Sequence, residues 1–248
     1  MLTQERKQLI LDQLKKTGRI VAKDLSETLK LSEDTIRRDL RELAAEGLLQ
    51  RVHGGALPAS PTIANLAQRR GMAVEEKTRL AHLAVKSLAK GQSIFLDGGT
   101  SNLELVRALP LDLSLQVFTH SPTIAAALEQ HDRIEVVVIG GTLFKHSMVA
   151  LGASAARAIE NLRIDVFFLG LTGLHAKEGA TTGHHEEAVM KSLIAERAAE
   201  VVSIVSQEKI GAVSPHRIGG LDKLSSIYAT RQDGLAPLRK AGLQIISP

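Results

Sequence analysis

The chain has 248 residues, 44% of them hydrophobic, which suffices for a real core and places its length between that of one domain and two. It contains no cysteine, so disulfides and cysteine-ligated zinc are excluded. No apolar run reaches the roughly 18 residues of a membrane-spanning helix, and the first residues are too polar for a signal peptide. We therefore expect a cytoplasmic protein without membrane contact.

The formal net charge is only +4, and residues 1–57 and 58–248 each carry an excess of two positive charges. Bulk charge therefore does not indicate nucleic acid, and only the local placement of arginines can do so. Aromatic residues make up 2% of the chain, which argues against stacking of single-stranded bases but leaves duplex recognition open.

The first residues predict two helices joined by a short turn. One helix runs from Thr3, its expected cap, to about Lys16, and Gly18 is placed to end it. The second covers about 23–29 and leads into a tight turn at Lys30-Leu31. Such a pair is a helix-turn-helix.

A third helix is predicted to begin after Ser32, whose hydroxyl suits an N-cap. Its apolar residues recur at i, i+4 and i+7 and make one buried stripe, while arginines occupy the flank and the opposite face. Beyond Gly47, residues 48–52 predict a strand that turns at 53–55 toward residues 56–57, which is typical of a wing.

A winged helix-turn-helix places its third helix in the DNA major groove. The predicted DNA contacts, from this helix and the wing, are Ser32, Glu33, Asp34, Thr35, Arg37, Arg38, Arg41, Arg51 and His53. The alternative is a solvated face whose arginines pair with the nearby acids Asp34, Asp39 and Glu42.

The stretch Pro58-Ala59-Ser60-Pro61 has the composition of a linker. It predicts a DNA-binding domain at 1–57, a linker at 58–74 and a second domain at 75–248. The linker contains Arg69-Arg70, which could contact DNA, the second domain or only water, and water is the default expectation.

From residue 75 onward, apolar strands alternate with helices, which predicts a doubly wound, mostly parallel α/β domain. The expected strands are 93–96, 116–118, 134–139, 165–169, 201–205 and 225–228, and the expected helices are 76–88, 101–109, 122–129, 153–161 and 185–199. Such sheets bind ligands beyond the carboxyl ends of their strands.

Glycines and hydroxyl-bearing residues follow the first three strands and precede helices, where backbone N–H groups can hold a phosphate. They are Asp97, Gly98, Gly99, Thr100 and Ser101, then Thr119, His120 and Ser121, then Gly140 and Gly141. Each group taken singly is also explained as a simple chain reversal. Neither a dinucleotide fingerprint nor a phosphate-binding G-x-x-x-x-G-K-[ST] loop is present, so we expect no nucleotide cofactor.

The run His184-His185-Glu186-Glu187 lacks the second histidine of a zinc-protease helix, because position 189 is valine. A helix start is expected there, and no metal site. Lys191 follows Glu187 by four residues on one helix face. The two side chains are expected either to form a surface ion pair or, if they face the strand ends, to place Lys191 where it binds a phosphate.

The run Thr35-Ile36-Arg37-Arg38-Asp39-Leu40, followed by Gly47, Arg51 and His53-Gly54-Gly55-Ala56, resembles the N-terminal signature of the DeoR family of bacterial transcriptional regulators. The second domain is similar too, since Asp97 to Ser101 matches the family loop D-x-G-T-T with a final serine. Other matching positions are Glu76-Lys77, Gly140-Gly141, 165–170, Glu187 and Lys191. The resemblance implies a sensor domain similar to ribose-5-phosphate isomerases, glucosamine-6-phosphate deaminases and CoA transferases, which responds to a phosphorylated sugar or related metabolite.

The chain departs from the family pattern at three places. It has Thr119-His120 for Thr-Asn, Ser206-Gln207-Glu208-Lys209-Ile210-Gly211 for Asp-Ser-Ser-Lys-Phe-Gly, and Thr230-Arg231 for Thr-Asp. Lys209 is kept and is therefore expected at the ligand. His120 can assist an anion or cap the helix that follows it.

Together with these patterns, the resemblance implies a repressor of a carbohydrate operon, without catalytic residues, that binds double-stranded operator DNA as a homo-oligomer, a dimer or tetramer. A phosphorylated metabolite is expected to release it. One alternative is an isomerase-like enzyme with a fused DNA-binding domain, in which Asp97, Glu187 and Lys191 supply acid–base groups. The other is a redox or metal sensor, which the absence of cysteine disfavours.

Overall fold

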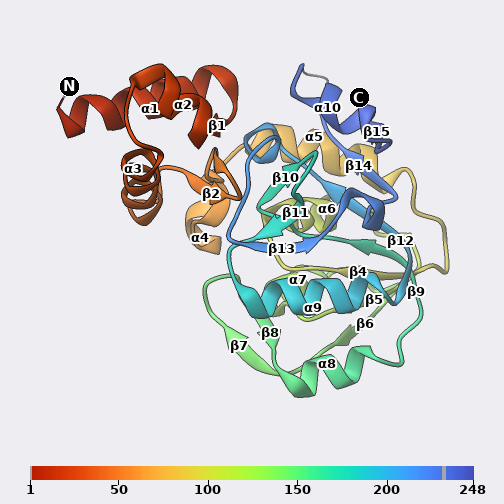
Figure 1. Cartoon of the computed structure of the whole chain (residues 1–248). Helices are drawn as coiled ribbons and strands as arrows, with labels where there is room; N and C mark the ends of the chain where they lie inside the picture. The colour runs from red at the N-terminus through yellow and green to blue at the C-terminus, as the bar shows by residue number, and fades with distance from the viewer. Residues whose placement is uncertain (1, 231–232) are drawn as a thin grey trace.

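The computed structural model describes residues 2–230 and 233–248, so Arg231, one of the departures noted above, lies outside the described residues. Figure 1 shows a small N-terminal domain (residues 2–57) beside a larger C-terminal domain (residues 74–248). The segment 58–73 connects them, and we call its residues 58–70 the strap.

The N-terminal domain is a winged helix-turn-helix, as predicted. Its elements are α1 (Thr3–Thr17), β1 (Ile20–Val21), α2 (Ala22–Leu29), α3 (Glu33–Ala45), β2 (Gln50–Val52) and β3 (Gly55–Leu57). The strands pair antiparallel in the order β1-β3-β2. Thr3 is the first helical residue rather than the cap, a position that Leu2 occupies.

Close backbone packing explains a glycine in the wing. A Cβ on Gly55 would lie 1.8 Å from the carbonyl oxygen of Ile20, so a side chain cannot be accommodated where β3 meets β1. The helices meet in a small core, where Ile36, Leu40 and Leu43 of α3 are almost completely buried, as their spacing predicts.

Among the described residues of the C-terminal domain, seven strands form one sheet in the order β15-β14-β12-β9-β4-β5-β6, with all neighbours parallel. They are β4 (Ser93–Leu96), β5 (Leu115–Thr119), β6 (Ile134–Val138), β9 (Ile164–Phe168), β12 (Ala198–Ile204), β14 (Ser226–Tyr228) and β15 (Gln244–Ile246). The predicted parallel sheet is confirmed, and β15 extends it.

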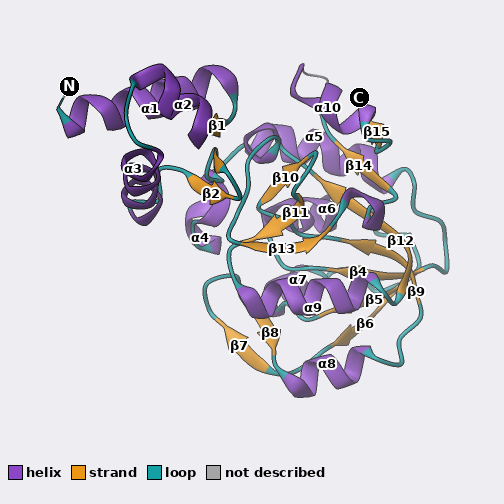
Figure 2. Ribbon diagram, viewed as in Figure 1, coloured by secondary structure: helices purple, strands orange, loops and turns teal. Residues whose placement is uncertain are grey.

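Helices cover both faces of this sheet (Figure 2). The first group shares one apolar cluster and consists of α5 (Val74–Val85), α6 (Thr100–Ala108) and α7 (Pro122–Ala127). The second group shares another cluster and consists of α8 (Ala153–Ile159), α9 (His185–Ala195) and α10 (Ala236–Lys240). Successive strand residues alternate between the clusters, since Phe95 belongs to one and Ile94 to the other, which makes the domain doubly wound.

Several short elements are not predicted by the sequence. They are the hairpin β7 (Thr142–Phe144) and β8 (Val149–Leu151), the antiparallel sheet β10 (Gly173–His175), β11 (Gly179–Thr182) and β13 (His216–Gly219), the helix α4 (Leu66–Arg69), and the 3-10 turns η1 (Pro61–Ile63), η2 (Gln207–Lys209), η3 (Leu221–Lys223) and η4 (Asp233–Leu235). These strands have only three or four residues each, which is too short to make a recognisable apolar run. Across the described ranges, none of the helices is long and apolar enough to cross a membrane.

The strand order locates the switch point of the sheet. Chain order reverses at β4, because β5 and β6 lie on one side of it while β9, β12 and β14 lie on the other. Loops leaving the carboxyl ends of β4 and β9 therefore diverge, and a crevice between such loops is where doubly wound sheets bind ligands.

Candidate functional site

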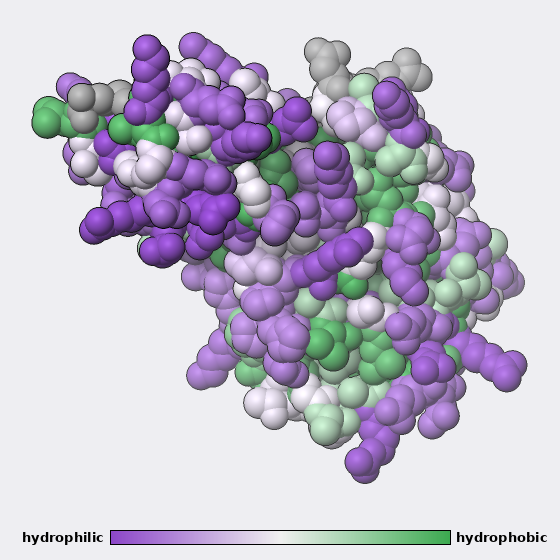
Figure 3. Space-filling model, viewed as in Figure 1, coloured by the Kyte–Doolittle hydropathy of each residue, from purple (hydrophilic) through white to green (hydrophobic). Residues whose placement is uncertain are grey.

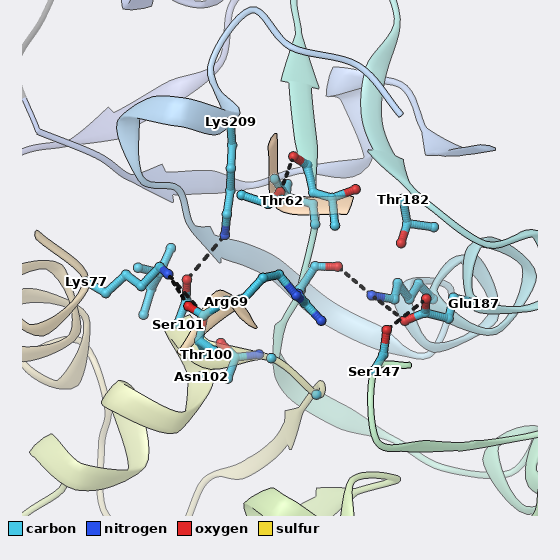
Figure 4. A pocket seen from close by; sticks show the side chains of 17 residues that line it. Thr62, Arg69, Lys77, Thr100, Ser101, Asn102, Ser147, Thr182, Glu187 and Lys209 are labelled. Atoms are coloured by element: carbon cyan, nitrogen blue, oxygen red, sulfur yellow. Dashed lines mark hydrogen bonds and ion pairs between the residues drawn. The ribbon is translucent and has the colours of Figure 1, made fainter. Parts of the chain in front are cut away.

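A cavity lies at this switch point (Figure 4). It is bounded by the loop after β4, the loop after β9, the start of α9, the turn η2 and the strap. The lining residues are Thr62, Arg69, Lys77, Gly98, Gly99, Thr100, Ser101, Asn102, Ser147, Gly170, Leu171, Thr172, Thr182, Glu187, Lys191, Ile204 and Lys209.

One end of the cavity is cationic. Thr100 and Ser101 begin α6, so the positive end of that helix faces the space. The Lys77 ammonium donates a hydrogen bond to Thr100 Oγ1 at 3.1 Å, and the Lys209 ammonium donates one to Ser101 Oγ at 3.3 Å. Backbone N–H groups, hydroxyls and two ammonium groups thus converge, an arrangement suited to an oxyanion.

The charged forms of the two lysines at this end are disfavoured by their surroundings. Burial lowers the pKa of Lys77, and burial together with the nearby Lys77 lowers the pKa of Lys209 to about 7. Both side chains are buried, at 2% and 7% exposure. A bound anion would favour their charged forms and relieve the repulsion between them.

The opposite end carries Glu187 and Lys191. Both side chains are 5% exposed, and their charged atoms lie 3.5 Å apart. Lys191 Nζ also lies 3.1 Å from Asp97 Oδ2 and donates a hydrogen bond to the Gly170 carbonyl at 2.7 Å. The surface ion pair is therefore the wrong alternative, because the two side chains face the strand ends. Ser147 donates to Glu187 at 3.2 Å, so a carboxylate and a hydroxyl are available here to a ligand.

Asp97 does not line the cavity but holds the backbone of two residues that do. Its carboxylate accepts hydrogen bonds from the backbone N–H groups of Gly98 at 2.7 Å and Gly170 at 2.8 Å, and from His120 Nε2 at 2.9 Å. Burial alone would raise the pKa of Asp97, but Lys191 and the His120 hydrogen bond lower it to about 2. A Cβ on Gly170 would lie 2.8 Å from the Asp97 carboxylate, so glycine is required at this approach.

His120 neither reaches the cavity nor caps a helix, so both predicted roles are wrong. Its ring is completely buried, with Nε2 donating to Asp97 and Nδ1 facing the Ala150 carbonyl oxygen at 3.0 Å. Both ring nitrogens thus face oxygen atoms that accept hydrogen bonds. His120 thereby ties β8 to the end of β4.

Other residues of the predicted ligand set lie outside the cavity lining. Thr119 donates to the Leu96 carbonyl and Ser121 to the Met148 carbonyl, so both hold the backbone. Gly140 and Gly141 lead into the β7–β8 hairpin rather than into a helix. These residues follow β5 and β6, on the side of β4 away from the switch point. The ligand-set residues that do line the cavity are Gly98, Gly99, Thr100, Ser101, Glu187, Lys191 and Lys209.

Sequence reasoning missed the contribution of the strap. Arg69 lies in the cavity rather than in water, whereas its neighbour Arg70 is exposed as expected. Thr62 is 2% exposed and also lines the space. Ser147 and Thr182 come from the unpredicted hairpins. No periodicity or motif marks these residues, because they are brought to the cavity by the tertiary fold.

The departure at Ser206 has a local structural role. Its hydroxyl donates to Glu208 at 2.7 Å and the residue is fully buried at the start of η2, the turn that carries Lys209. Among the described residues, no cluster of three or more histidine, aspartate or glutamate side chains is arranged to hold a metal ion.

The predicted DNA-binding surface lies on α3 and the wing. Ser32 caps α3 as expected, accepting a hydrogen bond from the Thr35 N–H at 3.2 Å. Ser32, Asp34, Arg37, Arg38, Arg41, Arg51 and His53 are exposed, and Glu33 and Thr35 are half-buried. Figure 3 shows strongly hydrophilic side chains gathered over this domain.

Two arginines of α3 make ion pairs with acids of their own helix, and one of these acids, Glu42, is among those expected. Arg37 pairs with Glu33 at 2.8 Å and Arg38 with Glu42 at 3.3 Å. Asp39 is instead 2% exposed and accepts two hydrogen bonds from Arg6 of α1, which joins the two helices. Exposed pairs contribute roughly 0–1 kcal/mol, so Arg37 and Arg38 are readily released to another anion.

A shallow hollow separates α3 from the wing. Arg37 of α3 and Arg51 and His53 of the wing line it together. The fold thus brings cationic side chains from two elements to one surface, as a duplex-binding face requires.

A winged helix-turn-helix joined to an α/β domain with a polar cavity at its switch point defines a two-domain transcriptional regulator. Residues 6–62 match the model of the DeoR-like helix-turn-helix domain, and residues 72–229 match that of the DeoR C-terminal sensor domain. The chain belongs to the DeoR family, and it is a DNA-binding transcriptional regulator.

Characterised relatives are similar over nearly the whole chain. The HTH-type transcriptional regulator GlpR of Haloferax volcanii is 36% identical over 226 residues, which cover 90% of this chain and 88% of the relative. The glycerol-3-phosphate regulon repressor of Escherichia coli is 28% identical, with 88% and 87% covered. The HTH-type transcriptional repressor GlcR of Bacillus subtilis is 28% identical, with 93% and 90% covered.

Proposed function

We propose that this regulator is a repressor of a carbohydrate-metabolism operon, which a phosphorylated sugar or related metabolite releases from its operator. The main support for the proposal is that the two ends of the cavity carry different polar groups. One end offers cations and a helix N-terminus, and the other offers a carboxylate with hydroxyls. The names of relatives, a glycerol-3-phosphate regulon repressor among them, support the same reading.

The cationic end is suited to a phosphate monoester. Two ammonium groups, Lys77 and Lys209, and the start of α6 match its negative charge and its acceptor oxygens. At the other end, Glu187 can accept hydrogen bonds from sugar hydroxyls, and Ser147 can donate or accept. A ligand that carries a phosphate and several hydroxyls satisfies both ends at once.

We propose binding rather than catalysis as the role of this cavity. Asp97, one candidate base, is completely buried, is held by several hydrogen bonds and has its pKa lowered to about 2. Glu187 is engaged by Lys191 and Ser147. Neither carboxylate is therefore prepared to remove a proton. Conversion of a phosphorylated sugar by the purified protein would favour the isomerase-like alternative.

On the DNA side, we propose that α3 enters the major groove and that the wing approaches the flanking backbone. Arg37, Arg38 and Arg41 are exposed on α3, and Arg51 and His53 on the wing. Helix-turn-helix proteins commonly read two half-sites, so a dimer or a larger homo-oligomer is the form proposed to bind.

A fluorescence-anisotropy titration tests the whole proposal. The full chain is titrated onto a labelled duplex from the promoter beside its own gene, and phosphorylated sugars are then added one at a time. Binding at low concentration that one phosphosugar reverses, while the same sugar without phosphate does not, is the expected result. Absence of binding, or binding that every phosphosugar leaves unchanged, would refute the proposal.

Lys209 gives the ligand response a pH dependence. Because burial and Lys77 lower its pKa to about 7, the cationic form that attracts phosphate is lost as the pH rises above 7. A phosphate monoester is already fully dianionic there, since its second pKa is about 6. We therefore expect phosphosugar affinity, measured by calorimetry, to fall by up to roughly tenfold per unit between pH 7 and 9.

The matched variants for this prediction are Lys209→Met and Lys90→Met. Lys209→Met should bind more weakly than the unmodified protein at pH 7 and show no further loss up to pH 9. Lys90 is exposed, so Lys90→Met should behave as the unmodified protein does. An equal decline in Lys209→Met would assign the pH dependence to another group.

A further inference from the structure

The strap is attached to the C-terminal domain near the cavity. Ser60 N–H donates to the Val213 carbonyl, and Val213 N–H donates to the Pro58 carbonyl, each at 3.1 Å. The hydroxyls of Ser60 and Thr62 both donate to the carbonyl oxygen of Thr172, a residue of the cavity wall. The first half of the strap is thus held to one wall.

The second half is held at two further places. His146, in the hairpin turn, donates from Nε2 to the Ile63 carbonyl at 2.7 Å and accepts at its own carbonyl from Leu66 N–H at 2.9 Å. Lys77 donates to the carbonyls of Arg69 and Met72 while also bonding the cavity residue Thr100. The strap is therefore tied to several walls of the cavity at once.

The Arg69 side chain extends into the cavity from this strap, as Figure 4 shows. Its Nε is buried and finds no hydrogen-bond partner among the described residues. Glu187 and Asp97 act on it only through space, and burial lowers the pKa of Arg69. The residue is half-buried, and a buried N–H without a hydrogen-bond partner is unfavourable, while a planar guanidinium is well matched to phosphate oxygens.

Besides Lys191, the cavity thus has one cation from each of three elements. Lys77 belongs to α5 and Lys209 to η2, but Arg69 belongs to the segment that leads to the DNA-binding domain. Strand β3 of the wing ends at Leu57, and the strap begins at the next residue, so no spacer separates them.

We propose that Arg69 completes the anion site and couples it to DNA binding: a phosphate that engages the guanidinium fixes the strap, and with it the wing, in a position unsuited to the operator. This inference rests on the proposed function, because it names the residue through which the same ligand acts. The ligand can change the populations of the two strap positions only if it binds the protein more tightly in one of them than in the other. Arg69 provides that difference, because it moves with the strap.

The anion site is tested with Arg69→Gln and the matched control Arg70→Gln, which removes an exposed arginine from the adjacent position. Inorganic phosphate is the first probe, followed by the phosphosugar that releases the operator, and thermal stability is the readout. We expect the affinity of Arg69→Gln for phosphate to fall roughly ten- to a hundredfold, and that of Arg70→Gln to be unchanged. Equal stabilisation of both variants would overturn the role of Arg69.

The coupling is tested by hydrogen exchange of residues 58–70 and by operator anisotropy. In the unmodified protein, phosphosugar should slow exchange in the strap. The variant His146→Ala removes one attachment and leaves Arg69 in place, so it should still bind phosphosugar but require a higher occupancy to leave the operator. Strap exchange unaffected by bound ligand, or a His146→Ala response identical to that of the unmodified protein, would contradict the coupling.

These outcomes separate the inference from the function on which it rests. If the unmodified protein responds to a phosphosugar while Arg69→Gln responds equally, the repressor proposal stands and the role of Arg69 fails. If neither inorganic phosphate nor any phosphosugar stabilises the unmodified protein, the proposed effector itself is wrong, and the Arg69 inference fails with it.

Discussion

Replacement of Asp97 by asparagine is expected to lower the free energy of unfolding of the C-terminal domain by roughly 3–5 kcal/mol, the usual cost of breaking a buried ion pair. Asparagine is similar in size, but it removes the negative charge opposite Lys191 and His120. Its amide also offers a single acceptor oxygen where the carboxylate accepts from Gly98 and Gly170 through different atoms.

The intrinsic fluorescence of Tyr228 allows this domain to be observed by itself. Tyr228 is the sole tyrosine, the chain has no tryptophan, and the ring is buried in β14 with its hydroxyl donating to Ser87. Urea unfolding followed at this residue therefore reports the C-terminal domain. Asp112→Asn, at an exposed aspartate of the same domain, is the control and should unfold as the unmodified protein does.

The loss of stability caused by Asp97→Asn is expected to depend on pH. Because the folded pKa of Asp97 is about 2, below the value of 3.8 expected when it is unfolded, its contribution is fully present above pH 4 and is lost as the pH falls toward 2. The linked free energy is about 2 kcal/mol. The stability difference between the unmodified protein and Asp97→Asn should accordingly narrow between pH 4 and pH 2. A difference that stays constant over this range would show that the charge of Asp97 is not what stabilises the domain.

The second large effect is expected at the operator. Arg37→Ala and Arg38→Ala should each weaken binding by roughly 1–3 kcal/mol if the side chain is bidentate to a base. The ion pairs with Glu33 and Glu42 are exposed, so breaking them to reach DNA costs little. Fluorescence anisotropy at several salt concentrations separates the two possible contacts, because loss of a phosphate contact flattens the salt dependence, whereas loss of a base contact relaxes sequence preference.

Arg157→Ala is the control for this pair. It removes the same charge from an exposed position of α8 in the C-terminal domain, far along the chain from α3. Its operator affinity and salt dependence should match those of the unmodified protein. If Arg37→Ala and Arg38→Ala both bound the operator as Arg157→Ala does, α3 would not be the helix in the groove.

Local pattern was sufficient to predict most of the fold. The spacing of Ile36, Leu40 and Leu43 identified the buried face of α3, and the cap at Ser32 identified its start. Apolar runs identified most strands of the parallel sheet, because strands buried on both faces are apolar without interruption. Elements such as β7 and β8 escaped because three-residue strands carry no detectable period.

The candidate site was predictable only in part. Sequence placed Thr100, Ser101 and Lys191 at strand ends or helix starts, and these do line the cavity. It could not give the strand order, so residues after β5 and β6 were expected at the cavity although the switch point lies between β4 and β9. Arg69 was missed for a different reason: its burial depends on how the strap folds back, which no local pattern encodes.

The direct junction between β3 and the strap, at Leu57 and Pro58, also limits how the two domains can be recombined in chimeric regulators. With a flexible linker, one DNA-binding domain could be exchanged for another without regard to the exact fusion point. Here β3 leads directly into the strap, so the residue at which two domains are fused affects the coupling between them. A chimera that keeps this junction should answer to its sensor's ligand. One that inserts two glycines between Leu57 and Pro58 should bind both DNA and ligand yet transmit nothing between them.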